Sequence, residues 1–178
     1  SSGDIIFFLD SDDYFKNTKV EKILNEFKNN PNLKIIYDLP TFKFKNKEKI
    51  KKSNFNFYKT YWPFIPPQSC ISIRKNNLEE VFSLLDINDF SDVWMDFRIG
   101  IISKYIYKQH YIFKNSFTYY RQSEQNISSK YKFLSKKWWR RRQVAHDYVN
   151  FFFRKNQIKF NKNLDYYITR LVNKIYEV

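Results

Sequence analysis

Cysteine and histidine are nearly absent from this sequence of 178 residues, which contains one cysteine and two histidines. With Cys70 as the single cysteine, neither an internal disulfide nor a cysteine metal cluster can form within one chain. Single-cysteine usage fits a reducing cytoplasm, and a thiol on a half-buried strand is expected to be inert. His110 and His146 lie far apart in the sequence, so we expect a core or surface position for each, not a shared metal site.

The sequence also lacks an apolar run long enough to span a bilayer. It is rich instead in positive charge and aromatic residues, with a formal net charge of +14 and an aromatic content of 21%. An excess of cations predicts an anionic partner, such as nucleic acid, an acidic membrane surface or a phosphorylated substrate. For most individual lysines, a simple solvated surface remains the alternative. The length fits one domain with its own hydrophobic core.

The most informative stretch is an apolar segment that ends in carboxylates. Residues 5–9 read Ile-Ile-Phe-Phe-Leu, which predicts a short strand buried on both faces. Asp10, Asp12 and Asp13 follow it, at the carboxyl edge where open α/β sheets bind ligands. If the strand geometry persists, Asp10 and Asp12 leave on the same face and repel each other unless a cation lies between them. The pattern favours Mg²⁺ or Mn²⁺ beside a phosphate group, and the alternative is a turn or a helix cap over residues 10–13.

Hydrophobic periodicity predicts alternating strands and helices along the rest of the chain. Two helices have capping signals, one with Thr18 before Glu21 and one with Asn77 before Glu80. The last helix is expected to bury a stripe of Leu164, Ile168, Leu171 and Ile175. The other expected segments are a strand over 33–39, an exposed loop over 43–56, an irregular segment over 58–67, a strand over 70–74, a helix over 92–105, strands over 111–113 and 117–120, and a helix after 132. This order predicts an α/β domain with a helical tail.

Four segments occur in an order that resembles a known family. They are a glycine, an apolar strand and Asp-x-Asp-Asp over residues 3–13, the strand over 66–74, an Asp with an Arg six residues later over 92–98, and Tyr-Tyr-Arg-Gln leading to Asn and Ser over 119–129. Together they resemble the family 2 glycosyltransferases, which have the GT-A fold. The resemblance implies the C-terminal, acceptor-side portion of a GT-A-like mixed sheet flanked by helices, lacking the N-terminal nucleotide-binding half. We therefore expect a catalytic, acceptor-side portion in residues 1–129 and a basic, aromatic helical extension in residues 130–178.

The resemblance also implies an activity, the inverting transfer of a sugar from a nucleotide-diphospho-sugar to an acceptor hydroxyl. Asp12 would bind Mg²⁺ or Mn²⁺ directly, and Asp10 would lie near the ribose or the water shell of the metal. Asp92 would be the general base, with Asp96 one helical turn further as the reserve candidate, and Arg121 would contact the diphosphate.

The setting that the resemblance implies is bacterial surface polysaccharide or glycoconjugate synthesis. The acceptor would be a glycan or a lipid-linked carrier, and the protein would be cytoplasmic, with peripheral contact at the inner face of the cell membrane. Two positions differ from the family pattern, because Ser91 replaces the usual Glu and Ser123 replaces a frequent His.

Two other functions remain open. HAD-type phosphatases also begin with an apolar strand and Asp-x-Asp, although here Asp13 and Tyr14 replace their Gly-Thr or Gly-Val. A non-catalytic basic module is the second, because residues 136–142 read Lys-Lys-Trp-Trp-Arg-Arg-Arg and suit nucleic acid or an anionic membrane. If the transferase hypothesis holds, membrane contact is favoured over nucleic acid. An ordinary amphipathic helix explains the same residues equally well.

Overall fold

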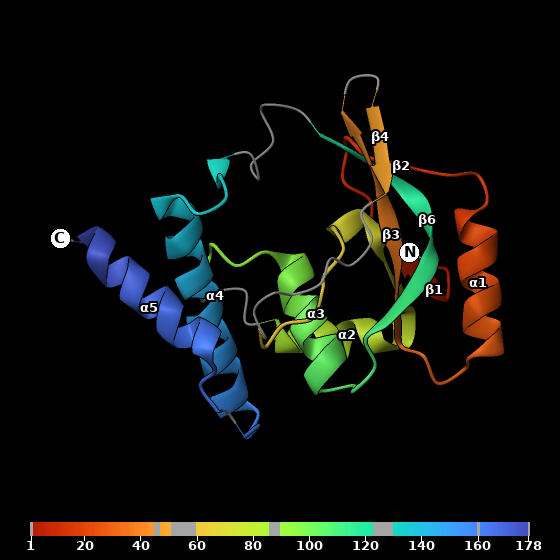
Figure 1. Ribbon diagram of the computed structural model, residues 1–178. Helices are drawn as coiled ribbons and strands as arrows, with labels where there is room; N and C mark the ends of the chain where they lie inside the picture. Colours follow the sequence, from red (N-terminus) through yellow and green to blue (C-terminus); the bar gives the residue numbers. More distant parts are fainter. Residues whose placement is uncertain are drawn as a thin grey trace. The chain divides into compact units, whose positions relative to one another are not determined.

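Strands and helices alternate in the first of two compact units of the chain (Figure 1). The computed structural model describes residues 2–44, 47–50, 60–85, 90–122, 130–159 and 161–177. The first unit comprises residues 1–54, 63–86 and 95–122, and the second comprises residues 55–62, 87–94 and 123–178. The elements of the first unit are β1 (Ile5–Phe7), β2 (Tyr14–Phe15), α1 (Lys19–Asn29), β3 (Ile35–Phe44), β4 (Lys47–Ile50), β5 (Ile71–Arg74), α2 (Leu78–Leu84), α3 (Met95–Tyr105) and β6 (Tyr111–Arg121), with short 3₁₀ turns at Gln68–Cys70 and Lys75–Asn77.

One mixed sheet of six strands is the centre of the first unit. The strand order is β1-β5-β3-β6-β2, and β4 pairs with the far end of β3. Strand β3 runs parallel to β6 and antiparallel to β5 and β4, while β1 and β2 pair antiparallel with β5 and β6. The predicted class, a mixed α/β fold with a sheet flanked by helices, is therefore confirmed.

Helices cover both faces of this sheet, with α1 on one face and α2 and α3 on the other (Figure 1). Under α1, Ile23 and Phe27 pack with Ile36 of β3 and Phe117 of β6. All four side chains are at most 6% exposed, so this layer excludes water and can stabilise the unit by hydrophobic burial. The spacing of Ile23 and Phe27, one helical turn apart, explains why they share a face.

The second unit is helical and aromatic. Helix α4 (Lys136–Lys155) packs against α5 (Leu164–Glu177), and the core is formed by Tyr148, Val149, Phe152, Phe153 and Tyr166. Two short segments join this core from elsewhere in the chain. The Tyr61 ring lies 6.4 Å from that of Phe153, and the Phe90 ring lies 5.8 Å from that of Tyr148. No helix in the described part of the chain is long and apolar enough to cross a membrane.

Strand β1 differs from the prediction of a strand buried on both faces. Its three side chains are only half-buried, and within the described residues it pairs with β5 alone, in antiparallel fashion. A run of apolar residues indicates burial, but it does not distinguish a central strand from one at the end of the strand order.

The strand boundaries also differ from the predictions. The two short strands expected over 111–113 and 117–120 form the single strand β6, whose pairing with β3 contains a register shift. Strand β3 extends to Phe44, and β4 occupies part of the loop expected over 43–56. Residues 45–46 and 51–56 of that loop lie outside the described residues. The four residues of β4 are all exposed, and so their composition gives no sign of a buried strand face.

The helix starts were only partly predicted. Thr18 and Asn77 are N-cap residues as expected, but neither side chain makes a capping hydrogen bond, so the predicted capping boxes are wrong. Helix α3 begins at Met95 and not at Asp92, because residues 90–93 form a turn in which the Val93 amide donates to the Phe90 carbonyl (2.8 Å). The prediction that Asp92 lies on this helix is wrong.

The buried face predicted for the last helix is wrong as well. Leu164, Leu171 and Ile175 are 72%, 61% and 64% exposed, and α5 instead buries Asp165, Tyr166, Thr169 and Asn173. Two polar side chains of this face, Asp165 and Asn173, have hydrogen-bond partners in α4. The apolar periodicity of the sequence carries no information about such polar contacts.

Candidate functional site

The three carboxylates after β1 lie in a loop, residues 8–13, that links β1 to β2; we call it the acidic loop. Because β1 ends at Phe7, the extended geometry does not persist as far as Asp10. The Asp13 amide donates to the Asp10 carbonyl (3.0 Å), so residues 10–13 form a turn, as the alternative interpretation held. The acids do follow the carboxyl end of a strand, the edge at which α/β sheets bind ligands.

Ser69, in the 3₁₀ turn Gln68–Cys70 that precedes β5, holds the turn over residues 10–13. Its hydroxyl accepts a hydrogen bond from the Asp10 amide (3.0 Å) and donates one to Asp13 Oδ2 (2.6 Å). The Arg121 amide donates to Asp13 Oδ1 (2.9 Å), and Arg121 Nε donates to the Asp12 carbonyl. Asp13 is buried, whereas Asp12 is exposed and Asp10 is half-buried. Asp13 therefore anchors the turn, and Asp10 and Asp12 are the carboxylates that a ligand could reach.

A buried ion pair, Lys19 with Asp38, contacts the Ser69 backbone and holds it in place. Lys19 Nζ lies 2.9 Å from Asp38 Oδ1, donates to the Ser69 carbonyl (2.7 Å) and donates to Thr118 Oγ1 (2.8 Å). The side chains of Lys19 and Asp38 are both 0% exposed. Burial raises the pKa of Asp38, while the charge of Lys19 and hydrogen bonds from Lys19, Thr118 and the Phe117 amide oppose this. The sequence analysis missed this network, although the spacing of Lys19, four residues before the buried Ile23, was a signal for it.

The electrostatics of the acidic loop fit a cation. Burial raises the pKa of Asp10, the nearby charge of Asp12 raises it further, and Ser69 opposes both effects. Burial also raises the pKa of Asp13, against hydrogen bonds from Ser69 and the Arg121 amide. Carboxylates that repel each other in this way are relieved by a hard divalent ion.

The acidic loop offers few side chains that could bind such an ion. In the described part of the chain, no group of three or more His, Cys, Asp or Glu side chains is arranged to hold a metal ion. Two carboxylates are nevertheless enough for an ion that keeps waters and also binds substrate phosphates, as Mg²⁺ commonly does. Asp10 and Asp12 therefore fit a metal of this kind as oxygen ligands.

Cations and tyrosines lie beside the acidic loop. The rings of Tyr14 and Tyr119 stack with centroids 4.6 Å apart, and Lys43 Nζ donates to the Tyr14 hydroxyl (3.0 Å). Lys16 Nζ lies 5.2 Å from the Tyr119 ring, and the Arg121 guanidinium lies 5.9 Å from the Tyr14 ring. Positive charge next to a pair of carboxylates suits a ligand that carries both a metal ion and phosphate groups.

Asp92 belongs to the second unit and lies in the turn before α3. It lines a pocket of about 270 Å³, which we call the cationic pocket, together with Lys130, Tyr131, Lys137, Arg140, Arg141 and Val144. The Arg141 guanidinium lies 3.4 Å from the centroid of the Trp94 ring and 4.6 Å from that of Tyr131, which orients it. An exposed carboxylate among four cationic residues is a suitable place for an anionic ligand that also has a proton to give up.

Asp96 belongs to the first unit, in the first turn of α3. Its Oδ1 accepts a hydrogen bond from the Phe97 amide (2.7 Å). Burial raises the pKa of Tyr37 in β3, the Ser103 hydroxyl opposes this, and the charge of Asp96 adds to it. Because α3 begins only at Met95, Asp92 and Asp96 do not share a helix face, contrary to the prediction.

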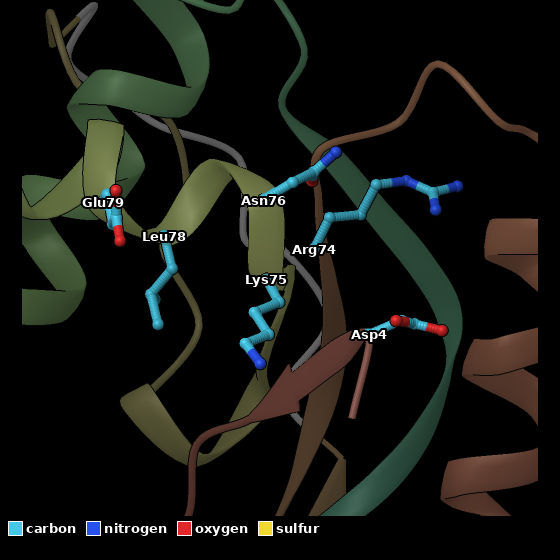
Figure 2. Close-up of a pocket in the computed structure, with 6 residues that line it drawn as sticks. All are labelled: Asp4, Arg74, Lys75, Asn76, Leu78 and Glu79. Carbon is cyan, nitrogen blue, oxygen red and sulfur yellow. The ribbon is translucent and has the colours of Figure 1, made fainter. Parts of the chain in front are cut away.

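A larger pocket of about 670 Å³ lies at the other end of β1, near Asp4 (Figure 2). It is lined by Asp4, Arg74, Lys75, Asn76, Leu78 and Glu79. The Arg74 guanidinium points away from Lys75 in Figure 2 and donates to the carbonyls of Leu33 and Phe27, both at 2.8 Å. This guanidinium is thus occupied in holding the end of α1, and the pocket includes none of the residues of the acidic loop.

Comparison with known proteins bears on the acidic loop. Residues 1–74 match the family model of glycosyl transferase family 2. The match supports a family 2 glycosyltransferase-like domain over this part of the chain. No curated protein matches the sequence.

The matched range includes Asp10, Asp12, Asp13 and Ser69. The resemblance to family 2 glycosyltransferases is therefore confirmed for the part that contains the acidic loop and its main support. Asp92, Asp96 and Arg121 lie beyond the match, so their roles stay predictions. The closing motif over 119–129 lies only partly within the described residues, because residues 123–129 are outside them. The Ser123 position belongs to this part.

Proposed function

We propose that the protein transfers a sugar from a nucleotide-diphospho-sugar to an acceptor hydroxyl, with inversion at the sugar carbon. One observation carries the proposal: the acidic loop lies within the segment that matches glycosyl transferase family 2, and Ser69 and Arg121 fix its turn. The match itself points to a nucleotide-sugar donor and an acceptor as the substrates.

Asp12 and Asp10 would hold the divalent ion, Mg²⁺ or Mn²⁺. Such an ion, when bound, stabilises negative charge that develops on a departing diphosphate. Asp13 would keep the turn in shape through Ser69, and the Arg121 side chain, next to the Asp12 carbonyl, would contact the diphosphate. Lys43, which donates to Tyr14, and Lys16, which lies over Tyr119, add positive charge near the loop.

Asp92 would act as the general base, taking the proton from the acceptor hydroxyl. The cationic pocket around it suits an acceptor that carries phosphate, such as a lipid-linked glycan. Asp96 is the second candidate for this role. A bacterial surface polysaccharide or glycoconjugate pathway, in the cytoplasm with peripheral contact at the inner face of the membrane, completes the proposal.

The proposal is tested by nucleotide binding and nucleotide release. The full chain is titrated with nucleoside diphosphates in the presence of Mn²⁺, and diphosphate release is followed with a panel of nucleotide-sugars. Asp12→Asn should weaken Mn²⁺-dependent nucleotide binding by at least roughly 10- to 100-fold, because even the residues that only orient metal ligands usually contribute that much. Asp92→Asn should keep nucleotide binding and lose about 10²- to 10⁴-fold in transfer, as expected for a general base.

Asp4→Asn is the matched control, because it removes the same charge at the opposite end of β1, where Asp4 is exposed. It should bind nucleotide like the wild type. Equal binding by the wild type and Asp12→Asn, or binding that ignores Mn²⁺, would contradict the proposal. Hydrolysis of a simple phosphate ester with Mg²⁺, abolished by Asp10→Asn, would favour the phosphatase alternative instead.

A further inference from the structure

Helix α5 packs against its own unit with its polar side. Asp165 Oδ1 accepts hydrogen bonds from Arg142 Nε and the terminal guanidinium nitrogen (2.9 and 2.6 Å), and its Oδ2 lies 2.9 Å from His146 Nε2. Further along the same side, Asn173 Nδ2 donates to the Trp139 carbonyl (3.0 Å). Asp165, Thr169 and Asn173 are at most 7% exposed. The orientation of α5 is therefore set by specific polar contacts.

The opposite side of α5 is apolar and open to solvent. Leu164, Tyr167, Leu171 and Ile175 are 72%, 56%, 61% and 64% exposed, respectively. Their spacing of three, four and four residues places them in one stripe along the helix, which we call the α5 stripe. A continuous apolar stripe on the outside of a helix commonly marks a surface that binds a membrane or another protein.

Cations surround the α5 stripe. Lys162 precedes the helix, Lys174 lies along it, and both are exposed. At its C-terminal end, Lys136 Nζ donates to the Tyr176 carbonyl (2.5 Å), which places another exposed lysine there. Arg170 is paired with Asp147 (2.5 Å). Over residues 130–178 the sequence has thirteen lysines and arginines against three acidic residues.

The positive charge around the α5 stripe favours one kind of binding partner over the others. Two copies of the chain that met through the α5 stripe would bring two strongly positive surfaces together, which costs free energy by like-charge repulsion. Nucleic acid satisfies the charge but leaves the aliphatic side chains without a partner. An anionic lipid surface satisfies both features, because apolar side chains enter the headgroup and acyl boundary while lysines meet phosphates.

We propose that α5 is the surface by which the protein lies on an anionic lipid bilayer, with the α5 stripe facing the acyl chains. The inference rests on the membrane contact included in the proposed function and names the surface that makes it. Within residues 136–142 only Lys136 lies beside this surface, because its Nζ reaches the Tyr176 carbonyl. The two last arginines of that range are engaged within the second unit, Arg141 on Trp94 and Tyr131, and Arg142 on Asp165.

Vesicle flotation tests the proposal with the nuclease-treated full chain. Vesicles of phosphatidylcholine with phosphatidylglycerol are compared with vesicles of phosphatidylcholine alone, and the wild type should bind the anionic vesicles. Replacing Leu164, Leu171 and Ile175 together by glutamine should weaken this binding by roughly tenfold or more, since buried apolar groups supply much of the affinity.

The matched control replaces Val20, Ile50 and Phe82, which are 45%, 48% and 40% exposed in the first unit, by glutamine. It should bind within about twofold of the wild type.

A fluorescent label gives a second measurement that does not depend on the triple variant. Leu171→Cys can be labelled with an environment-sensitive dye, because Cys70 is buried and burial raises the pKa of its thiol, which keeps it unreactive. The emission should shift to the blue on anionic vesicles. The same dye on Lys159→Cys, which precedes the helix at an exposed position, should shift less.

Several results would overturn the proposal. They are no binding of the wild type to anionic vesicles, equal binding by the α5 variant, a dimer in light scattering that the α5 variant abolishes, RNA binding that it abolishes, or a lower unfolding midpoint that shows the stripe to be covered by another part of the chain. Asp12→Asn, which tests the proposed chemistry, should float with the vesicles like the wild type. Failure of the catalytic proposal is thereby distinguished from failure of the membrane surface.

Discussion

Helix α1 of the first unit and helix α5 of the second are both amphipathic, but each turns a different side toward its own unit. Helix α1 buries Ile23 and Phe27, and α5 buries Asp165 and Asn173 while its leucines face solvent. The charge differs in parallel, because residues 1–129 have 19 basic and 15 acidic residues, whereas residues 130–178 have 13 and 3. The comparison shows that the apolar side of an amphipathic helix need not be the side that faces the core of its own unit.

Breaking the buried ion pair between Lys19 of α1 and Asp38 of β3 should have the largest effect on stability. Lys19→Met leaves the Asp38 carboxylate without its cation at a site that is 0% exposed. Removing one partner of a buried ion pair costs about 3–5 kcal/mol. Urea unfolding measures the loss. Lys22→Met is the control, since Lys22 meets Glu21 at the surface (3.9 Å), and its effect should stay within about 0.5 kcal/mol. Equal losses for the two variants would show that the pair does not form.

The direct test of the comparison is one alanine substitution in each helix. Ile23→Ala removes a side chain that is 0% exposed and should lower the free energy of unfolding by about 2–4 kcal/mol. Leu171→Ala removes one that is 61% exposed and should change it by less than about 0.5 kcal/mol in the absence of lipid. Denaturant titration of both variants gives the values. A loss of about 2 kcal/mol or more for Leu171→Ala would mean that α5 buries its apolar side after all.

The polar side of α5 predicts a pH dependence. Burial raises the pKa of Asp165, but hydrogen bonds and charges from His146 and Arg142 outweigh this and hold the pKa below its ordinary value of 3.8. A carboxyl whose pKa falls on folding adds stability above its unfolded pKa, and this stability is lost as the pH falls through the folded-state pKa.

Asp165→Asn should therefore cost about 1.5–3 kcal/mol at neutral pH, the usual value of hydrogen bonds to a charged group. It should also make the unfolding free energy less sensitive to acid below the ordinary carboxyl pKa. Unfolding curves from neutral to acidic pH measure both effects. Asp147→Asn is the control, because burial raises the pKa of Asp147 and the sign of its pH dependence is opposite. If Asp165→Asn and the wild type lost the same unfolding free energy on acidification, the interaction of Asp165 with Arg142 and His146 would be contradicted.

The smallest effect concerns the helix starts. The Ser135 hydroxyl accepts a hydrogen bond from the Trp138 amide (3.2 Å) at the start of α4, whereas Thr18 makes no such bond at the start of α1. Ser135→Ala should cost about 1 kcal/mol and Thr18→Ala only a few tenths. Thermal unfolding followed by circular dichroism compares them. A larger loss for Thr18→Ala would show that the predicted capping box forms in solution.

Much of the first unit was predictable from the sequence. The order of its strands and helices follows from local periodicity, and the acidic loop is recognisable because an apolar strand and three carboxylates are adjacent in the chain. The pairing partner of β1 was not predictable, since antiparallel pairing with β5 joins residues almost 70 positions apart. Strand pairing over such separations leaves no local pattern.

The parts of the site that join distant residues were the ones missed. Ser69 reads as an ordinary residue before a strand, and only the folded chain brings its hydroxyl to Asp13, 56 positions away. Lys19 was overlooked because a lysine in an apolar stripe is expected at the surface unless it is paired. The partner, Asp38, lies within an apolar strand, so two unusual residues together could have suggested a buried pair.

The acidic loop begins at β1 and ends at β2, the two outermost members of the order β1-β5-β3-β6-β2. Six residues thus tie together strands that share no hydrogen-bonded ladder of their own. A nucleotide or ion bound to Asp10 and Asp12 would stabilise the loop that joins these two outer strands. Binding of the donor should therefore raise the melting temperature of the whole first unit.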